Sequence, residues 1–197
     1  LLFTGGTQIG KKVMKAASDN LVPVTLELGG KSPVIVDENA DLSDVAKKVM
    51  RGKTMNAGQI CLAPDYLMLP KGKSEEFAKA SNEAISEMFA DLKYNEDYTS
   101  VINERHYERI NELVSDAKEK GAEVIQINPA DEDFEQQELH KIPPTLVLNP
   151  TDEMKIMQEE IFGPVLPVKE YDDFDETVNY VNSKDRPLGL YLFSKDK

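Results

Sequence analysis

The chain has 197 residues, of which 40% are hydrophobic and 30% charged, a composition typical of a globular protein. Its formal net charge of −13 argues against nucleic-acid and anionic-membrane partners, because proteins that bind them normally carry a basic surface. We find no apolar run of the roughly 18 residues that a membrane span requires, and no secretory signal pattern. The single cysteine cannot form an internal disulfide, so we expect a reducing, cytoplasmic location.

In chain order, the first third alternates strand and helix patterns. Residues 1–4 form an apolar strand, and a Gly-Gly turn leads into a helix over 8–18. Apolar and β-branched residues predict strands over 22–28 and 33–36. Asp41 is expected to cap a helix with an apolar face at the i, i+3, i+4, i+7 spacing. That face comprises Leu42, Val45, Ala46, Val49 and Met50.

The rest of the chain continues the alternation. A strand over 66–69 precedes a helix over 77–88, and a further helix over 107–117 is closed by Gly121. The acidic segment 128–140 is expected to be an exposed loop. Further strands are predicted over 124–127, 145–148, 165–168 and 188–193. Asp173 and Glu176 resemble a capping box that begins the last helix.

Alternating strands and helices imply βαβ units, so the predicted fold class is α/β. We expect an open, mostly parallel, twisted sheet with flanking helices in three layers. Because the sequence opens as a strand already in progress and stops after another, we expect a piece of a longer protein.

Cys61 is the first candidate for chemistry. Gly58 and Pro64 flank it, which predicts a loop that presents the thiol rather than burying it. The alternative is a small buried hydrophobe, the commoner role of a lone cysteine. No histidine is near in sequence, so a Cys-His protease pair is poorly supported. His106 and His140 are expected to be solvated.

Glu27 is the second candidate. Alternation along a strand places Leu26 and Leu28 on one face and Glu27 on the other. An apolar setting would bring the pKa of its carboxyl toward about 6–7, which suits a general base. The alternative is a strand-end glutamate paired with Lys31 or another cation, and the motif alone does not decide between them.

Two glycine-containing strings are further candidates. Residues 5–10 (GGTQIG) follow a strand and open a helix, the setting in which backbone amides receive a phosphate. Their spacing departs from G-x-G-x-x-G, and such a string is more often just a tight βα turn. Residues 159–164 (EEIFGP) could present a carboxylate and a ring to a ligand. Their alternative role is a strand entry with solvated acids.

Together, four strings resemble the aldehyde dehydrogenase family, in its order and approximate spacing. They are residues 3–7 (FTGGT), 26–33 (LELGGKSP), 56–61 (NAGQIC) and 159–165 (EEIFGPV). The resemblance covers essentially the whole chain and implies the family's catalytic domain over 1–197, truncated at both ends and without the N-terminal coenzyme-binding domain. The tail at 63–66 (APDY) is similar to the branch that includes coniferyl aldehyde and fatty aldehyde dehydrogenases.

The resemblance implies a mechanism in which Cys61 attacks an aldehyde to give a thiohemiacetal, while its backbone N–H helps to hold the oxyanion. Hydride would pass to NAD or NADP and leave a thioester, and Glu27 would activate the water that hydrolyses it. No metal is implied.

The resemblance also implies the coenzyme contacts. Glu160 would hold the nicotinamide ribose, Phe162 would lie near the nicotinamide, and the Leu28 carbonyl would orient its amide. The turn at Gly5 and Gly6 would approach the pyrophosphate. Gly6 departs from the family pattern, because many relatives have serine there.

The partners implied are a small-molecule aldehyde and, in the full-length protein, further copies of the same chain. The identity of the aldehyde stays open, and the branch suggests a coniferyl-like aromatic aldehyde as one example. The choice between NAD and NADP stays open as well. Two alternatives stay open as well. One is a non-catalytic folding or assembly module that lacks most of the coenzyme site. The other is a cysteine hydrolase without coenzyme that uses the same Cys61 and Glu27.

Overall fold

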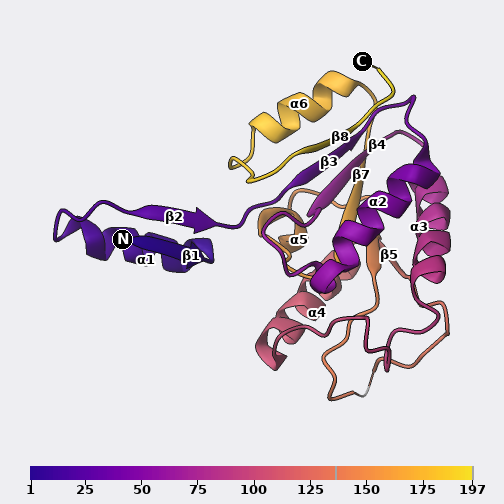
Figure 1. Ribbon diagram of the computed structural model, residues 1–197. Coiled ribbons are helices and arrows are strands. Elements are labelled where there is room, and N and C mark those ends of the chain that lie inside the picture. Colours follow the sequence, from indigo (N-terminus) through magenta and orange to yellow (C-terminus); the bar gives the residue numbers. More distant parts are fainter. Residues whose placement is uncertain (136, 197) are drawn as a thin grey trace.

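The computed structural model describes residues 1–135 and 137–196, which form two sheets (Figure 1). The smaller sheet pairs β1 (Leu2–Gly5) with β2 (Thr25–Leu28) in parallel, and α1 (Thr7–Ser18) connects them. This βαβ unit projects from the main body, and the arrowhead of β2 points toward that body (Figure 1).

The main sheet has six strands in the order β5-β6-β7-β4-β3-β8. Its strands are β3 (Pro33–Val36), β4 (Tyr66–Pro70), β5 (Glu123–Gln126), β6 (Thr145–Leu148), β7 (Val165–Tyr171) and β8 (Tyr191–Phe193). All neighbours are parallel except β5 and β6. The prediction of a mostly parallel α/β sheet is therefore confirmed. The structure corrects one point, because β3 already has β4 and β8 as neighbours and β2 therefore builds a separate sheet.

Helices cover both faces of the main sheet and complete the three layers. On one face, α2 (Leu42–Thr54) and α3 (Ser74–Met88) pack over Leu67 and Leu69. On the other, α4 (Glu104–Glu119), α5 (Lys155–Gln158) and α6 (Phe174–Asn182) lie over Tyr66 and Met68. Successive side chains of β4 therefore belong to two separate hydrophobic cores, the first under α2 and α3 and the second under α4, α5 and α6.

The helix boundaries follow local chemistry that the sequence largely predicted. Asp41 caps α2 by accepting from the N–H groups of residues 43 and 44 at 3.0 and 3.3 Å. Gly121 closes α4 in the left-handed conformation, with φ of 91°. The capping box is wrong in detail, because the Glu176 carboxylate accepts from the N–H of Asp172 and not from the N-cap residue Asp173. Neither α5 nor the short 3-10 turn η1 (Met55–Gly58) was predicted.

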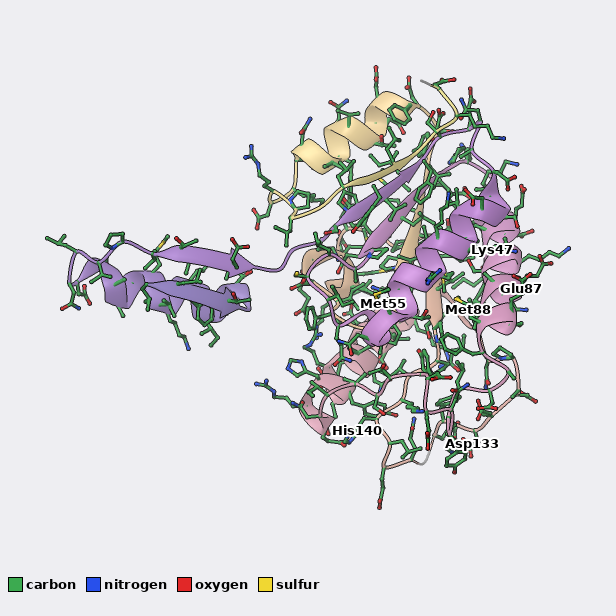
Figure 2. All side chains as sticks on the ribbon, viewed as in Figure 1. Lys47, Met55, Glu87, Met88, Asp133 and His140 are labelled. Carbon is green, nitrogen blue, oxygen red and sulfur yellow. The ribbon has the colours of Figure 1, made fainter. Side chains whose placement is uncertain are left out.

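The remaining predictions concern residues at the surface of the chain. Lys47 and Glu87 join α2 to α3 through an exposed ion pair of 2.9 Å (Figure 2). The described part of segment 128–140 is a surface loop as expected, since each of its residues is exposed or half-buried, and position 136 lies outside the described residues. His106 and His140, expected to be solvated, both lie at the surface with intermediate exposure, and His140 pairs with Glu104 there. None of the described helices combines the length and the apolar character that crossing a bilayer requires.

Candidate active site

Three segments that are distant in sequence meet at the amino edge of the main sheet. The loop with Cys61 precedes β4, the turn 160–163 precedes β7, and residues 29–30 precede β3. Since β7, β4 and β3 are parallel neighbours, their amino ends lie side by side. The segment 29–32 also joins this edge to the carboxyl end of β2, so the carboxyl end of the small sheet lies beside it (Figure 1).

The loop that carries Cys61 has an unusual backbone. Asn56, Ala57 and Gly58 are left-handed in succession, with φ of 50°, 52° and 71°. A Cβ on Gly58 would lie 2.4 Å from the carbonyl oxygen of Gly163, so glycine is what allows this loop to touch the turn before β7. Cys61 itself is exposed, so the alternative of a buried hydrophobe is wrong.

Neighbouring residues tie this loop down on both sides of the thiol. The Gln59 side-chain amide donates to the Ser100 carbonyl at 3.0 Å. On the other side, the Tyr191 hydroxyl donates to the Leu62 carbonyl at 2.6 Å. Over residues 1–135 and 137–196 we find no acceptor for the backbone N–H of Cys61. An exposed thiol on such a loop, beside an N–H for which we find no acceptor, can attack a carbonyl and receive the resulting oxyanion.

Lys53 lies behind this loop and was not predicted. Its side chain is 1% exposed, and its ammonium donates to the Pro64 carbonyl at 2.8 Å. Burial lowers the pKa of Lys53 to about 8, with the Lys31 charge adding to the shift and the Asp65 charge opposing it. The sequence does indicate that Lys53 is buried, because position 53 continues the apolar face of α2, four residues after Val49.

Glu27 lies on β2 as the alternation predicted, with its side chain exposed and Leu26 and Leu28 more buried on the opposite face. Two expectations for it are wrong. Its setting in this chain is solvent-exposed rather than apolar, and Lys31 pairs with Asp65 instead of with Glu27.

Gly5 and Gly6 form the predicted turn between β1 and α1. Gly6 is the N-cap, and its carbonyl accepts from the N–H groups of Ile9 and Gly10 at 3.0 Å each. The N–H groups ahead of these have no partner within a helix, which leaves donors at the carboxyl end of β1. A Cβ on Gly6 would meet nothing within 4 Å, so the turn is open on this side.

Glu160 reaches across to the segment after β2. Its Oε1 accepts from the Gly30 N–H at 3.1 Å, and a Cβ on Gly29 would lie only 2.1 Å from its carboxylate. Burial raises the pKa of Glu160, and the Asp65 charge adds to the effect, while the Gly30 N–H and Arg109 oppose it. The structure therefore brings Glu160 to the residues that directly follow Leu28. Phe162, two residues further on, is left-handed with φ of 49° and 38% exposed.

An apolar cleft begins at the two neighbours of the candidate nucleophile, Ile60 and Leu62. It continues between α2 and β8. The remaining lining residues are Val34, Lys48, Val49, Gly52, Met55, Ala63, Pro64, Tyr191 and Phe193. The arrangement can hold an apolar group close to the cysteine loop.

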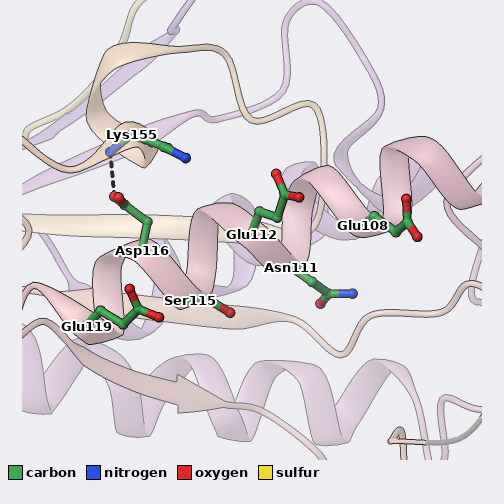
Figure 3. A pocket seen from close by; sticks show the side chains of 7 residues that line it. All are labelled: Glu108, Asn111, Glu112, Ser115, Asp116, Glu119 and Lys155. Atoms are coloured by element: carbon green, nitrogen blue, oxygen red, sulfur yellow. Dashed lines mark hydrogen bonds between the residues drawn. The ribbon is translucent and has the colours of Figure 1, made fainter.

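A second groove runs along α4 and is acidic (Figure 3). None of the predicted site residues lines it. The carboxylate of Asp116 in this groove is already engaged by the Lys155 N–H and the Lys120 ammonium, both at 2.8 Å. We assign no chemistry to this groove.

Comparison with known proteins gives the class that this fold and site define. The aldehyde dehydrogenase family model matches residues 1–197, and the chain belongs to that family.

Particular relatives narrow the comparison. A Caulobacter vibrioides protein named "Probable coniferyl aldehyde dehydrogenase" is 60% identical over the whole chain, which covers 41% of that protein. The substrate-bound AldH of Staphylococcus aureus superposes with a TM-score of 0.89 at 38% identity, over 100% of this chain and 41% of that one. Betaine aldehyde dehydrogenase from the same organism, in complex with NAD+, gives 0.86 at 30% identity, over 99% and 39%. The chain thus spans about two fifths of the relatives it matches.

Proposed function

We propose that this chain carries the nucleophile and part of the coenzyme site of an NAD(P)-dependent dehydrogenase that oxidises an aldehyde to a carboxylic acid. The observation that carries the proposal is the setting of Cys61. The only thiol of the chain is exposed on a tied-down loop, at the edge where residues 29–30 and the turn 160–163 converge.

In the first step, the Cys61 thiolate attacks the aldehyde carbon. A C–S bond forms, and the carbonyl electron pair moves to the oxygen, where the Cys61 N–H can stabilise it. A nicotinamide coenzyme, when bound, would accept the hydride that leaves this carbon, so that a thioester remains on Cys61.

In the second step, Glu27 takes a proton from water, and the resulting hydroxide attacks the thioester carbon. The C–S bond breaks, the acid leaves, and the thiolate is restored. An exposed position at the end of β2 gives Glu27 access to water.

The coenzyme would be held from both sheets. Glu160 would bind the ribose and Phe162 would lie against the nicotinamide, while the Leu28 carbonyl would orient the amide. The amides after Gly5 and Gly6 would receive the pyrophosphate. Two features of the chain fit such a group: the open space at Gly6, and the Glu160 carboxylate held on the Gly30 N–H at 3.1 Å.

The apolar cleft beside Cys61 supports a substrate with an apolar body. Together with the likeness to a coniferyl aldehyde dehydrogenase, it favours an aromatic aldehyde. A homo-oligomeric assembly and a cytoplasmic location stay predictions. The choice between NAD and NADP stays open.

The proposal is tested in the intact protein that carries this chain, by following reduced nicotinamide with aromatic and aliphatic aldehydes. Cys61→Ala should abolish turnover. Glu27→Gln should keep the burst of acylation and slow deacylation by about 10²–10⁴-fold, the usual contribution of a general base. Glu123→Gln, at an exposed strand position, is the matched control and should behave as wild type. Normal turnover by the Cys61→Ala protein would exclude the mechanism.

The second candidate is a non-catalytic folding or assembly module. It is favoured by the small βαβ unit, which leaves Leu2 69% and Leu21 93% exposed and its sheet without further strands among the described residues. Calorimetric titration of the 197-residue chain with NAD and NADP separates the two candidates. Stoichiometric, tight binding would exclude the module.

A further inference from the structure

The turn that carries Glu160 and Phe162 is held in a conformation that its sequence does not favour. Phe162 has φ of 49°, and a bulky residue in the left-handed region is strained. Its neighbour Ile161 is fully buried in the second hydrophobic core, while Glu160 is half-buried against Gly29 and Gly30 and Phe162 is exposed. Something outside the turn must fix this geometry.

The backbone N–H and the backbone carbonyl of Ile161 are both hydrogen-bonded to side chains from outside the turn. Its N–H donates to Oδ2 of Asp65 at 2.9 Å. Its carbonyl accepts from the guanidinium of Arg109, which also donates to the Glu160 carbonyl at 3.2 Å. The planar guanidinium thus spans two successive carbonyls, a task for which a lysine ammonium has no matching fork.

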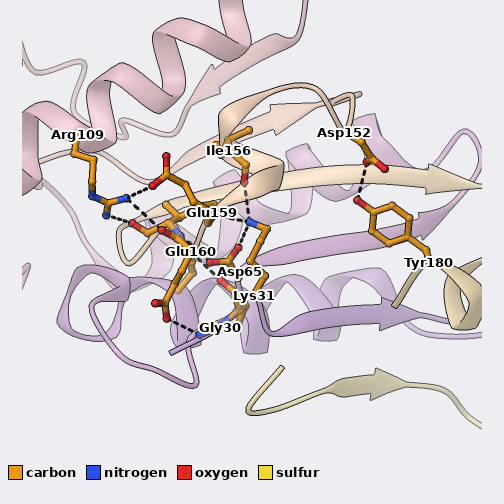
Figure 4. A network of polar contacts seen from close by, with 12 residues as sticks. Gly30, Lys31, Asp65, Arg109, Asp152, Ile156, Glu159, Glu160 and Tyr180 are labelled. Atoms are coloured by element: carbon orange, nitrogen blue, oxygen red, sulfur yellow. Dashed lines mark hydrogen bonds and ion pairs between the residues drawn. The ribbon is translucent and has the colours of Figure 1, made fainter. Parts of the chain in front are cut away.

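We call Arg109 and Asp65 the clamp, because they hold the backbone of Ile161 from two sides, and neither residue belongs to the turn. Arg109 extends from α4, and Asp65 lies four residues after Cys61 at the start of β4. Asp65 is 3% exposed, and its other oxygen is paired with Lys31. Lys31 in turn donates to the carbonyls of residues 156 and 159 at 2.7 and 3.0 Å (Figure 4). The clamp therefore ties the turn to the cysteine loop and to α4 at once.

We infer that Arg109 and Asp65 are positioning residues that set the affinity for the nicotinamide coenzyme, by holding Glu160 and Phe162 on either side of a pinned Ile161. The inference rests on the proposed function, in which the side chains of Glu160 and Phe162 contact the coenzyme. Arg109 itself need not touch the coenzyme, because its hydrogen bonds are to two backbone carbonyls of the turn and its remaining contact is a 3.9 Å ion pair with the Glu159 carboxylate.

The test compares Arg109→Met with Arg105→Met in the intact protein. Arg105 lies on the same helix, is exposed, and contacts only His106 among the hydrogen bonds of the described residues, so it controls for the loss of one charge. Arg109→Met should raise the KM for the coenzyme about tenfold, the equivalent of about 1.4 kcal/mol, with kcat within about twofold of wild type. Arg105→Met should change neither constant.

Two further measurements separate positioning from general stability. Amide hydrogen exchange over residues 160–163 should become faster in Arg109→Met and stay unchanged in Arg105→Met. Arg109→Lys, which keeps the charge and is the variant to use if Met prevents folding, should still show a raised coenzyme KM, because one ammonium cannot reproduce the fork. Full recovery of the wild-type KM by lysine would mean that charge alone matters and would overturn the inference.

An unchanged coenzyme KM together with faster exchange would also overturn it, while leaving the proposed function intact. Failure of the proposed function has a different signature, which is normal turnover after Cys61→Ala whatever happens at Arg109.

Discussion

Lys53 provides the sharpest prediction about stability, because a buried ammonium makes the free energy of unfolding depend on pH. Its pKa falls from an ordinary value of 10.5 to about 8 in the folded chain. Below pH 8 both states bind the proton, and the folded state bears the full cost of burying the charge. Between pH 8 and 10.5 the unfolded state binds more protons, so stability rises with pH in this window.

The size of the effect follows from the shift. A difference of 2.5 between 10.5 and 8, at about 1.36 kcal/mol per unit, corresponds to about 3 kcal/mol over the whole window. About 2 kcal/mol of this should appear between about pH 7 and about pH 9.5, before the tyrosines begin to titrate. The four tyrosines with raised pKa values act in the opposite sense, but only above their ordinary value of 10.0.

The assay is urea unfolding of the 197-residue chain at a series of pH values, for wild type and Lys53→Met. Methionine is similar in length and carries no charge, so it removes the titration while filling the space. Wild type should gain about 2 kcal/mol over the variant between about pH 7 and about pH 9.5. Lys48→Met, at an exposed position of the same helix, should keep the wild-type pH dependence. Parallel stability curves for wild type and Lys53→Met would refute the reasoning.

Two glycine pairs give the remaining predictions. Gly29→Ala would collide with the flexible Glu160 carboxylate at 2.1 Å, whereas Gly30→Ala meets only ordinary contacts at 3.6 Å. Gly29→Ala should therefore raise the coenzyme KM of the intact protein about tenfold with little loss of stability, and an equal effect of Gly30→Ala would contradict the placement of Glu160. Gly58 and Gly72 are both left-handed, but only a Cβ on Gly58 meets a backbone oxygen, at 2.4 Å. By urea unfolding of the chain, Gly72→Ala should cost about 1 kcal/mol and Gly58→Ala about 3 kcal/mol, and equal costs would show that the cysteine loop yields easily.

Strands and long helices were predictable because burial repeats along them with a fixed period. The apolar run at β6 and the spaced face of α2 both proved correct. The four-residue α5 was missed because it is too short to show a helical period. The left-handed run at Asn56 and Ala57 was missed for another reason, since neither residue type requires that conformation.

The candidate site was predictable in its parts but not in its connections. Glycine and proline around Cys61 correctly indicated an exposed loop, and alternation placed Glu27 on the outer face of β2. The catalytic roles of both stay predictions. The Arg109 and Asp65 contacts span 52 and 96 residues to Ile161, and no local pattern reports a hydrogen bond between a side chain and such a distant backbone group.

The position of the site on the amino edge of the main sheet follows from the separation of the two sheets. In open parallel sheets, ligands bind beyond the carboxyl ends of the strands, which would place this site at the opposite edge of the main sheet. Here the rule applies to β1 and β2, whose carboxyl ends carry Gly5, Gly6 and Glu27. The main sheet contributes only loops, and loops can take up the left-handed residues that let the cysteine loop touch the turn before β7, at Gly58 and Gly163. One sheet thus carries the helix N-terminus and the proposed base Glu27, and the other carries the proposed nucleophile Cys61 on a backbone that no regular strand could provide.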